Sequence, residues 1–252
     1  MNKLIACGLL LAISAINISS AYNFEDSAYN EVLARDLEEF ETETVAVHPR
    51  ARRDEEAASG SSDKCKRKRS KFCCAEETLE MIHDMEKPLK KECYKQITGK
   101  DKHSGYHGHN DPFKCDKDKV ERHRREMTCV MQCVGQKKDV LDAEGNIKEE
   151  AIKTQMKEKF AKEEWLAPKL NEILDRCITE AKQVPVKVEA EGKEAACNTT
   201  GMKFGHCFWR ELQFSCPADQ IKDQRACEKV KEKIKNYSDS YPFTSRNTME
   251  ED

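Results

Sequence analysis

Thirteen cysteines occur among the 252 residues of this sequence, and cysteine thiols can bind metals, act as nucleophiles or form disulfides. The compartment in which the protein works decides among these chemistries. Lys3 precedes an apolar run over residues 4–18, and the small residues Ser19 and Ala21 occupy the −3 and −1 positions of a cleavage site. Residues 1–21 are therefore predicted to be a secretory signal peptide. The protein is predicted to be secreted and extracellular, where disulfides persist.

Cleavage after Ala21 removes Cys7 and leaves an even number of cysteines, enough for six disulfides. No thiolate is then available for a metal site or for catalysis. The predicted disulfide cysteines are Cys65, Cys73, Cys74, Cys93, Cys115, Cys129, Cys133, Cys177, Cys197, Cys207, Cys216 and Cys227.

Histidines form the second group with possible chemistry. His103, His107 and His109 lie in the predicted loop 98–114, and His123 follows it, which is compatible with a metal site or a pH-sensitive lid. The intervening Gly and Ser residues make a preformed site unfavourable, so we favour a solvated loop. The prediction is no metal and no cofactor.

A third arrangement is Cys73-Cys74 followed by His83-Asp84, which resembles the secreted phospholipases A2. In that family the histidine follows the double cysteine within about one helical turn, after a glycine-rich calcium loop. Here eight residues intervene and those glycines are missing. No other nucleophile–base arrangement stands out, so the protein is predicted not to be an enzyme and to have no catalytic residues.

Composition excludes several further classes of partner. Without Lys3 the chain has 43 basic and 47 acidic residues, so no basic excess would attract nucleic acid. No later apolar stretch is long enough to predict membrane insertion. Charged residues make up 36% of the chain and the mean hydropathy is −0.84, so the core needs covalent support from disulfides.

Amphipathic patterns predict the elements that position these cysteines. Leu79, Ile82, Met85 and Leu89 recur at helical spacing, with a kink or a break into two helices at Pro88. Further helices are predicted over residues 120–134, 165–177 and 218–235. A turn is predicted at 142–146, with Asn146 and Glu149 as a capping pair at the start of another helix, and the segment 184–206 is predicted to be irregular.

The predicted fold class is all-α, a compact disulfide-stapled bundle of about six or more helices behind a disordered N-terminal extension. The predicted segments are a signal peptide (1–21), an acidic flexible extension (22–63), a cysteine-rich helical ligand-binding domain (64–236) and a flexible C-terminal tail (237–252). Residues 50–53, RARR, match a convertase cleavage motif. This suggests a propeptide up to Arg53, and a solvated basic cluster is the alternative.

Cys129 and Cys133 are four positions apart and therefore lie on one face of the predicted helix. We expect each to bond to a different helix instead of pairing with each other. Three residues separate these two cysteines, and the spacings that follow are 43, 19, nine and eight residues, with a proline directly after Cys216 and a last cysteine nine residues beyond it.

This spacing resembles that of the insect odorant-binding proteins, and the added Cys197, Pro217 and Cys227 resemble the Plus-C subgroup. The resemblance covers roughly residues 65–227. It implies a bundle of about six helices around an apolar cavity and an interlocked disulfide pairing. The implied pairs are Cys93–Cys133, Cys129–Cys207, Cys177–Cys216 and Cys197–Cys227, with Cys115 as the alternative to Cys93 and the four other cysteines forming two further bridges.

The implied function is transport: reversible binding of small hydrophobic molecules such as odorants or pheromones, with a membrane odorant receptor as an indirect partner in olfaction. The oligomeric state is left open. The alternative is a disulfide-rich secreted interaction protein without a small ligand, such as an inhibitor or a reproductive or immune fluid protein. Candidate ligand contacts on apolar helix faces are Met127, Val130, Met131, Leu170, Leu174, Phe208, Leu212 and Phe214. Asn198 and Asn236 begin glycosylation acceptor sequences.

Overall fold

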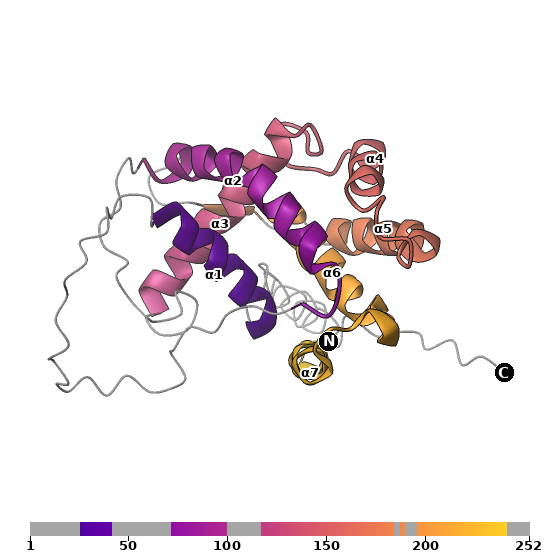
Figure 1. Ribbon diagram of the computed structural model, residues 1–252. Coiled ribbons are helices and arrows are strands. Elements are labelled where there is room, and N and C mark those ends of the chain that lie inside the picture. Colours follow the sequence, from indigo (N-terminus) through magenta and orange to yellow (C-terminus); the bar gives the residue numbers. More distant parts are fainter. Residues whose placement is uncertain (1–25, 42–71, 100–116, 184–186, 190–195, 241–252) are drawn as a thin grey trace, which may run out of the picture.

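Helices dominate the computed structural model, which describes residues 26–41, 72–99, 117–183, 187–189 and 196–240 (Figure 1). The described elements are α1 (Ser27–Glu41), α2 (Glu76–Thr98), α3 (Lys117–Lys137), α4 (Glu149–Lys159), α5 (Ala167–Lys182), β1 (Lys187–Glu189), β2 (Ala196–Asn198), α6 (Thr200–Ser215), the 3-10 turn η2 (Ala218–Gln220) and α7 (Gln224–Ser240). The predicted all-α, disulfide-stapled fold class is confirmed. The signal peptide, the RARR motif, Cys65, Cys115 and the three loop histidines lie outside the described residues.

Helix α2 has charges at both ends that favour a helix. Glu76 and Glu77 lie in its first turn and Lys95 in its last, where each sign complements the helix dipole. Gly99 ends the helix in the left-handed conformation, with φ 68°, and its N–H bonds to the carbonyl of Lys95. Pro88 lies inside the helix without dividing it, and Figure 1 shows α2 changing direction partway along its length. The alternative of two separate helices is therefore wrong.

The connection from α3 to α4 contains the predicted turn. The carboxylate of Asp142 accepts hydrogen bonds from the backbone N–H and the side-chain amide of Asn146 at 2.7 and 3.0 Å. These bonds, led by that of the Asn146 side chain, lower the pKa of Asp142. The predicted capping pair is wrong, because Lys148 is the N-cap of α4 and makes no side-chain capping bond.

Residues 184–206 contain more structure than predicted. β1 and β2 pair antiparallel, with Lys187 opposite Asn198, and α6 begins at Thr200. The predicted last helix also differs, because η2 precedes α7, which begins at Gln224. Short strands of three residues carry too little alternation to be read from a sequence.

The predicted flexible extension over residues 22–63 is corrected for residues 26–41. In this segment α1 packs against the helical domain, and Tyr29, Leu33 and Leu37 are buried. Figure 1 shows α1 beside α2, and the Cα atoms of α1 approach both α2 and α7. The acidic composition indicated a solvated segment, but three large side chains on one face of α1 are buried, and this face attaches the helix to the domain.

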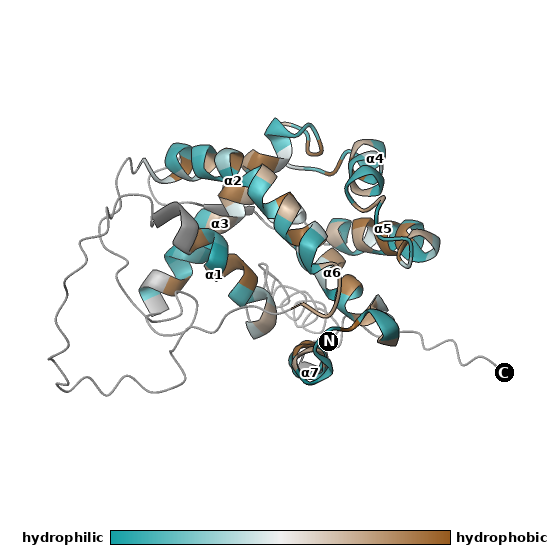
Figure 2. Ribbon diagram, viewed as in Figure 1, coloured by the Kyte–Doolittle hydropathy of each residue, from teal (hydrophilic) through white to brown (hydrophobic). Residues whose placement is uncertain are grey.

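Two apolar clusters make up most of the core, and α6 contributes to both. The first joins α1, α2, α3, α6 and α7, and includes Leu33, Met127, Met202 and Ile234. The second joins α4, α5, α6 and the segment between α3 and α4. Figure 2 shows that the helices carry both hydrophobic and hydrophilic residues, as expected for elements with one buried face. No helix among the described residues is long and apolar enough to cross a membrane.

Five disulfides connect the described elements, and they correct most of the implied pairing. They are Cys73–Cys227, Cys74–Cys216, Cys93–Cys133, Cys129–Cys197 and Cys177–Cys207. The pair Cys93–Cys133 is confirmed, whereas the implied pairs Cys129–Cys207, Cys177–Cys216 and Cys197–Cys227 are wrong. As predicted, the two cysteines of α3 bond to different elements, although one partner lies on a strand and not on a helix.

The positions of the elements explain the correction. Cys197 lies on β2, which runs beside α3, so it reaches Cys129. Cys207 lies on α6, which packs most extensively on α5, so it reaches Cys177. Cys216 follows α6 and bonds to Cys74 at the start of α2. The six cysteines from Cys93 to Cys207 keep the interlocked order, in which the first pairs with the third, the second with the fifth and the fourth with the sixth. The implied pairing had used Cys216 as the sixth cysteine of this set, one cysteine later.

Candidate binding cavity

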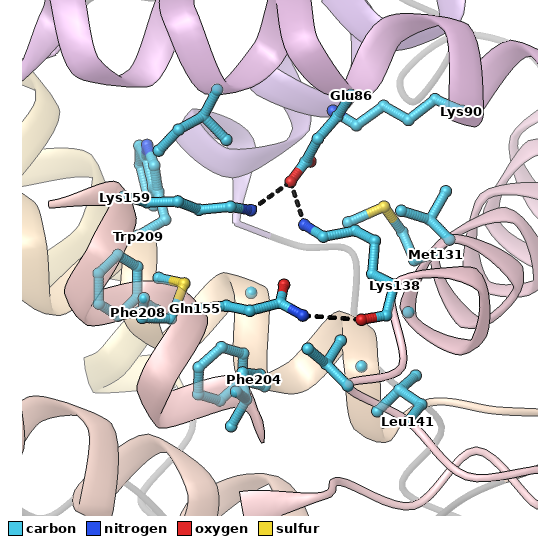
Figure 3. A pocket seen from close by; sticks show the side chains of 18 of the residues that line it. Glu86, Lys90, Met131, Lys138, Leu141, Gln155, Lys159, Phe204, Phe208 and Trp209 are labelled. Atoms are coloured by element: carbon cyan, nitrogen blue, oxygen red, sulfur yellow. Dashed lines mark hydrogen bonds and ion pairs between the residues drawn. The ribbon is translucent and has the colours of Figure 1, made fainter. Parts of the chain in front are cut away.

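A cavity of about 240 Å³ lies where the two apolar clusters meet, and α1, α2, α3, α4 and α6 contribute to its wall. Figure 3 shows the cavity from close by. Its buried apolar residues are Tyr29, Leu33, Val134 and Trp209 from the first cluster, and Val140, Leu141, Ile147, Ile152, Phe160, Phe204 and Phe208 from the second. Such a wall suits a small apolar molecule, because burial removes apolar surface from water.

Helix α6 creates much of this space through two glycines. Gly201 and Gly205 lie four positions apart, hence on one face, and both line the cavity. A Cβ atom added at Gly201 would lie 3.1 Å from Leu141 Cδ1, and one added at Gly205 would lie 3.0 Å from the Tyr29 hydroxyl. The paired spacing of these glycines with Phe204 and Phe208 is a signal in the sequence. It was missed because the segment up to residue 206 was predicted to be irregular.

One part of the cavity wall is charged. Lys138, after α3, and Lys159, at the end of α4, both donate to the same carboxylate oxygen of Glu86 on α2, the second at 2.6 Å (Figure 3). Burial alone would raise the pKa of Glu86, but Lys138, Lys159 and Lys90 outweigh it and hold that pKa at about 2. Burial lowers the pKa of Lys138 to about 8, an effect that Glu86 opposes and Lys159 reinforces. No sequence pattern had marked these residues.

A buried ion-pair cluster holds α1 against α2 at the same cavity. Asp36 on α1 accepts from Lys90 at 3.0 and 3.1 Å and contacts the Nε2 of His83 at 2.9 Å. Burial alone would raise the pKa of Asp36, but the charge of Lys90 and the hydrogen bond from His83 lower it. His83 and Lys90 thus lie on the buried face of α2. Met85, which was predicted to lie on the apolar face of this helix, is 58% exposed.

Further contacts fix the first turn of α1 on α6. The Nε2 of His206 lies 2.7 Å from the carboxylate of Asp26, just before the helix. The ring of Tyr29 packs at 4.9 Å from His206 and at 5.6 Å from Trp209, measured between ring centroids. Burial, together with Asp36 and Asp26, raises the pKa of Tyr29, so its hydroxyl remains protonated. The α1 wall of the cavity is therefore held by specific polar and aromatic contacts.

Two of the eight predicted ligand contacts, Met131 and Phe208, line the cavity. The other six lie in the core around it. Met127 and Val130 belong to the first apolar cluster, Phe214 packs on that cluster, and Leu170, Leu174 and Leu212 belong to the second. Their contact with a ligand remains a prediction. The apolar periodicity identified buried faces but could not separate cavity wall from packed core.

The two predicted glycosylation sites differ in accessibility. Asn198 is buried, and its side-chain oxygen accepts from the backbone N–H and hydroxyl of Thr200 at 2.9 and 2.5 Å. Its amide nitrogen lies within hydrogen-bond distance of Glu144 and Asn146. A glycan on Asn198 would require this turn to open, which argues against its use. Asn236, on α7, is exposed and remains a predicted site.

The remaining candidates carry no comparable site. Among the described residues, His, Cys, Asp and Glu form no group of three or more that could hold a metal ion. His123 is buried on α3 beside Glu126, 3.2 Å from its carboxylate. A second hollow, of about 350 Å³, lies near the start of α2, but polar groups such as Glu77, Glu163 and Lys222 line it. The cavity between the two clusters is therefore the candidate site for an apolar ligand.

Comparison with known proteins agrees with this architecture. The model of the PBP/GOBP family matches residues 74–199, which is half of the chain and extends from the start of α2 to β2. The match therefore includes four elements that carry disulfide-bonded cysteines, α2, α3, α5 and β2, and the residues that line the cavity outside α1 and α6. No curated protein and no solved structure matches the chain.

Proposed function

Because this chain belongs to the PBP/GOBP family, the insect odorant-binding proteins, we propose that it is a secreted carrier of one small hydrophobic molecule. The ligand, an odorant, a pheromone or a similar lipophilic compound, would bind reversibly in the cavity between the two apolar clusters. An odorant receptor in a membrane would be an indirect partner. The observation that carries the proposal is the apolar cavity itself, formed inside a family domain of binding proteins.

The physical basis of binding is the removal of apolar surface from water. Each methylene group transferred into the cavity contributes roughly 0.8 kcal/mol. Phe204, Phe208 and Trp209 offer aromatic faces, and Met131 adds a side chain that adapts to irregular shapes. Release without chemistry follows from the same contacts, because none of them needs a covalent step. Disulfides between the surrounding helices support a scaffold that keeps a cavity instead of collapsing.

We also propose that the chain belongs to the Plus-C subgroup. Beyond the three interlocked bridges, Cys73–Cys227 and Cys74–Cys216 tie the start of α2 to α7 and to the end of α6. Pro217 directly follows Cys216, as the subgroup's pattern requires. These additional bridges support the assignment.

Titration of the oxidised protein with an environment-sensitive apolar fluorophore tests the carrier function. We expect saturable one-to-one binding that small volatiles displace and that disulfide reduction abolishes. The variant Gly201→Leu is expected to lower the affinity at least tenfold, because the new side chain enters the cavity near Leu141. Helix α6 tolerates the change locally, since leucine favours helices more than glycine does.

Thr154→Leu is the matched control. It adds the same side chain on α4 at an exposed position, next to Gln155 and Met156, which line the cavity. Its binding should equal that of the unmodified protein. Equal binding by the Gly201 variant would place the ligand elsewhere, and absence of saturable binding by a folded protein with no free thiols would favour a surface interaction protein.

A further inference from the structure

The charged side chains that line the cavity do not balance. Lys90, Lys138 and Lys159 supply three ammonium groups, while Asp36 and Glu86 supply two carboxylates. Their side chains are between 5% and 21% exposed, so solvent screens them only in part. The described lining residues therefore leave an excess of one positive charge beside a largely apolar wall.

The contacts locate this excess. Asp36 and Lys90 form a close pair with two contacts of 3.0 and 3.1 Å, which leaves that part of the wall neutral. Glu86 has to neutralise both Lys138 and Lys159, and both bond to its same oxygen. One carboxylate thus faces two ammonium groups, and the uncompensated charge lies between α3 and α4.

These two lysines can bind a second anion. Each ammonium group has three N–H donors, and one of each is directed to Glu86. A charge that is incompletely paired among apolar groups is unfavourable, and the lowered pKa of Lys138 reflects that cost. The indole N–H of Trp209, which is buried and has no hydrogen-bond partner in the described part of the chain, adds a neutral donor in the cavity wall.

We infer that the ligand is a medium-chain carboxylate whose anionic head group binds between the ammonium groups of Lys138 and Lys159 while its chain packs on Phe204 and Phe208. The head group would complete the charge balance of the wall. The inference rests on the proposed carrier function and specifies its ligand class. A cavity of about 240 Å³ corresponds to roughly eight water volumes, so a molecule of about eight to ten non-hydrogen atoms, such as octanoate, fits its size.

Competition of octanoate, 1-octanol and methyl octanoate for the bound fluorophore at pH 7 tests this inference. The three compounds share a similar chain, and only octanoate carries a charge at this pH. We expect octanoate to bind at least tenfold more tightly than the two neutral compounds, as is typical for hydrogen bonds to charged groups. Lys138→Met and Lys159→Met should each reduce this preference while leaving the affinity for 1-octanol within about twofold.

Glu86→Gln is the decisive variant, because it removes the competing carboxylate and keeps the shape of the side chain. It should increase the affinity for octanoate and leave that for 1-octanol unchanged. If the cluster only holds the helices together, the same variant would instead weaken both ligands equally. Lys157→Met, at an exposed position two residues before Lys159, is the control for loss of a surface charge and should not alter the preference.

The outcomes separate the two levels of the proposal. Equal affinity of the unmodified protein for octanoate and 1-octanol would overturn the carboxylate inference and leave the carrier function in place. Failure of all three compounds and of the fluorophore to bind a folded protein would overturn the carrier function itself. A preference that persists in both lysine variants would assign the head group to another part of the wall.

Discussion

Lys138 lies between two opposing electrostatic effects. Its burial and the neighbouring ammonium of Lys159 favour the neutral amine, whereas the carboxylate of Glu86 favours the charged form. Burial prevails, and the pKa of Lys138 falls to about 8, close enough to neutrality for its charge to change under mild conditions. Residues of this kind escape sequence analysis, because a lysine in a sequence is read as exposed and only the fold places it beside a cavity.

The anion preference should therefore depend on pH. Between pH 7 and 9 Lys138 loses its proton, while Glu86, with a pKa of about 2, remains ionised. The affinity for octanoate should fall severalfold over this range, and the affinity for 1-octanol should stay constant. Displacement titrations at several pH values measure both affinities. The other charged groups at the cavity wall are Asp36, Lys90 and Lys159.

Lys138→Met supplies the control for this pH dependence. The variant lacks the amine that titrates, so its affinity for octanoate should be flat from pH 7 to 9. A fall of the same size in the variant would assign the pH dependence to a different group.

Helix α1 shows how an element can be missed although its residues are visible. Leu33 and Leu37 have helical spacing, but this spacing does not reveal whether the rest of the fold offers a surface on which the helix can dock. That surface includes Lys90 and His83, which a reading of apolar periodicity would place on the solvent side of α2. Regular apolar periodicity did predict α2, α3 and α5, because their buried faces carry enough apolar residues.

The Asp36–Lys90 pair is expected to be important for the attachment of α1. Asp36→Asn leaves the ammonium of Lys90 buried without its carboxylate partner, and such changes cost about 3–5 kcal/mol. We expect a lower unfolding midpoint in urea and weaker fluorophore binding, because Tyr29, Val32 and Leu33 of α1 line the cavity.

The double variant Asp36→Asn with Lys90→Met tests whether this loss comes from the pair. It should cost clearly less than the sum of the two single changes, since no unpaired ammonium remains. Additive losses would show that the two residues act independently.

Because the lowered pKa of Asp36 stabilises the fold above the ordinary carboxyl range, this contribution should also be lost as the pH falls below about 4.

At the scale of the whole molecule, the number and spacing of cysteines predicted the class of fold and the family, but not which residues pair. Nine residues separate Cys197 from Cys207 and eight separate Cys207 from Cys216, so the two intervals differ by a single residue. The choice between them depends on β2 lying beside α3 and α6 beside α5, which are contacts between elements distant in sequence. Spacing along a chain cannot distinguish such alternatives.

Disulfide mapping of the oxidised protein gives the direct check of this arrangement. Proteolysis without reduction, followed by mass spectrometry, should yield peptides that link Cys129 to Cys197 and Cys177 to Cys207. Peptides linking Cys129 to Cys207 would instead restore the pairing implied by the spacing and would contradict the packing of β2 on α3.

Replacement of both Cys177 and Cys207 by serine should cost about 2–5 kcal/mol in unfolding free energy, because the bridge restricts the unfolded chain. Since it joins α5 to α6, the helix that contributes Gly201, Phe204 and Phe208 to the cavity, the loss should also appear as weaker ligand binding at temperatures below the unfolding transition.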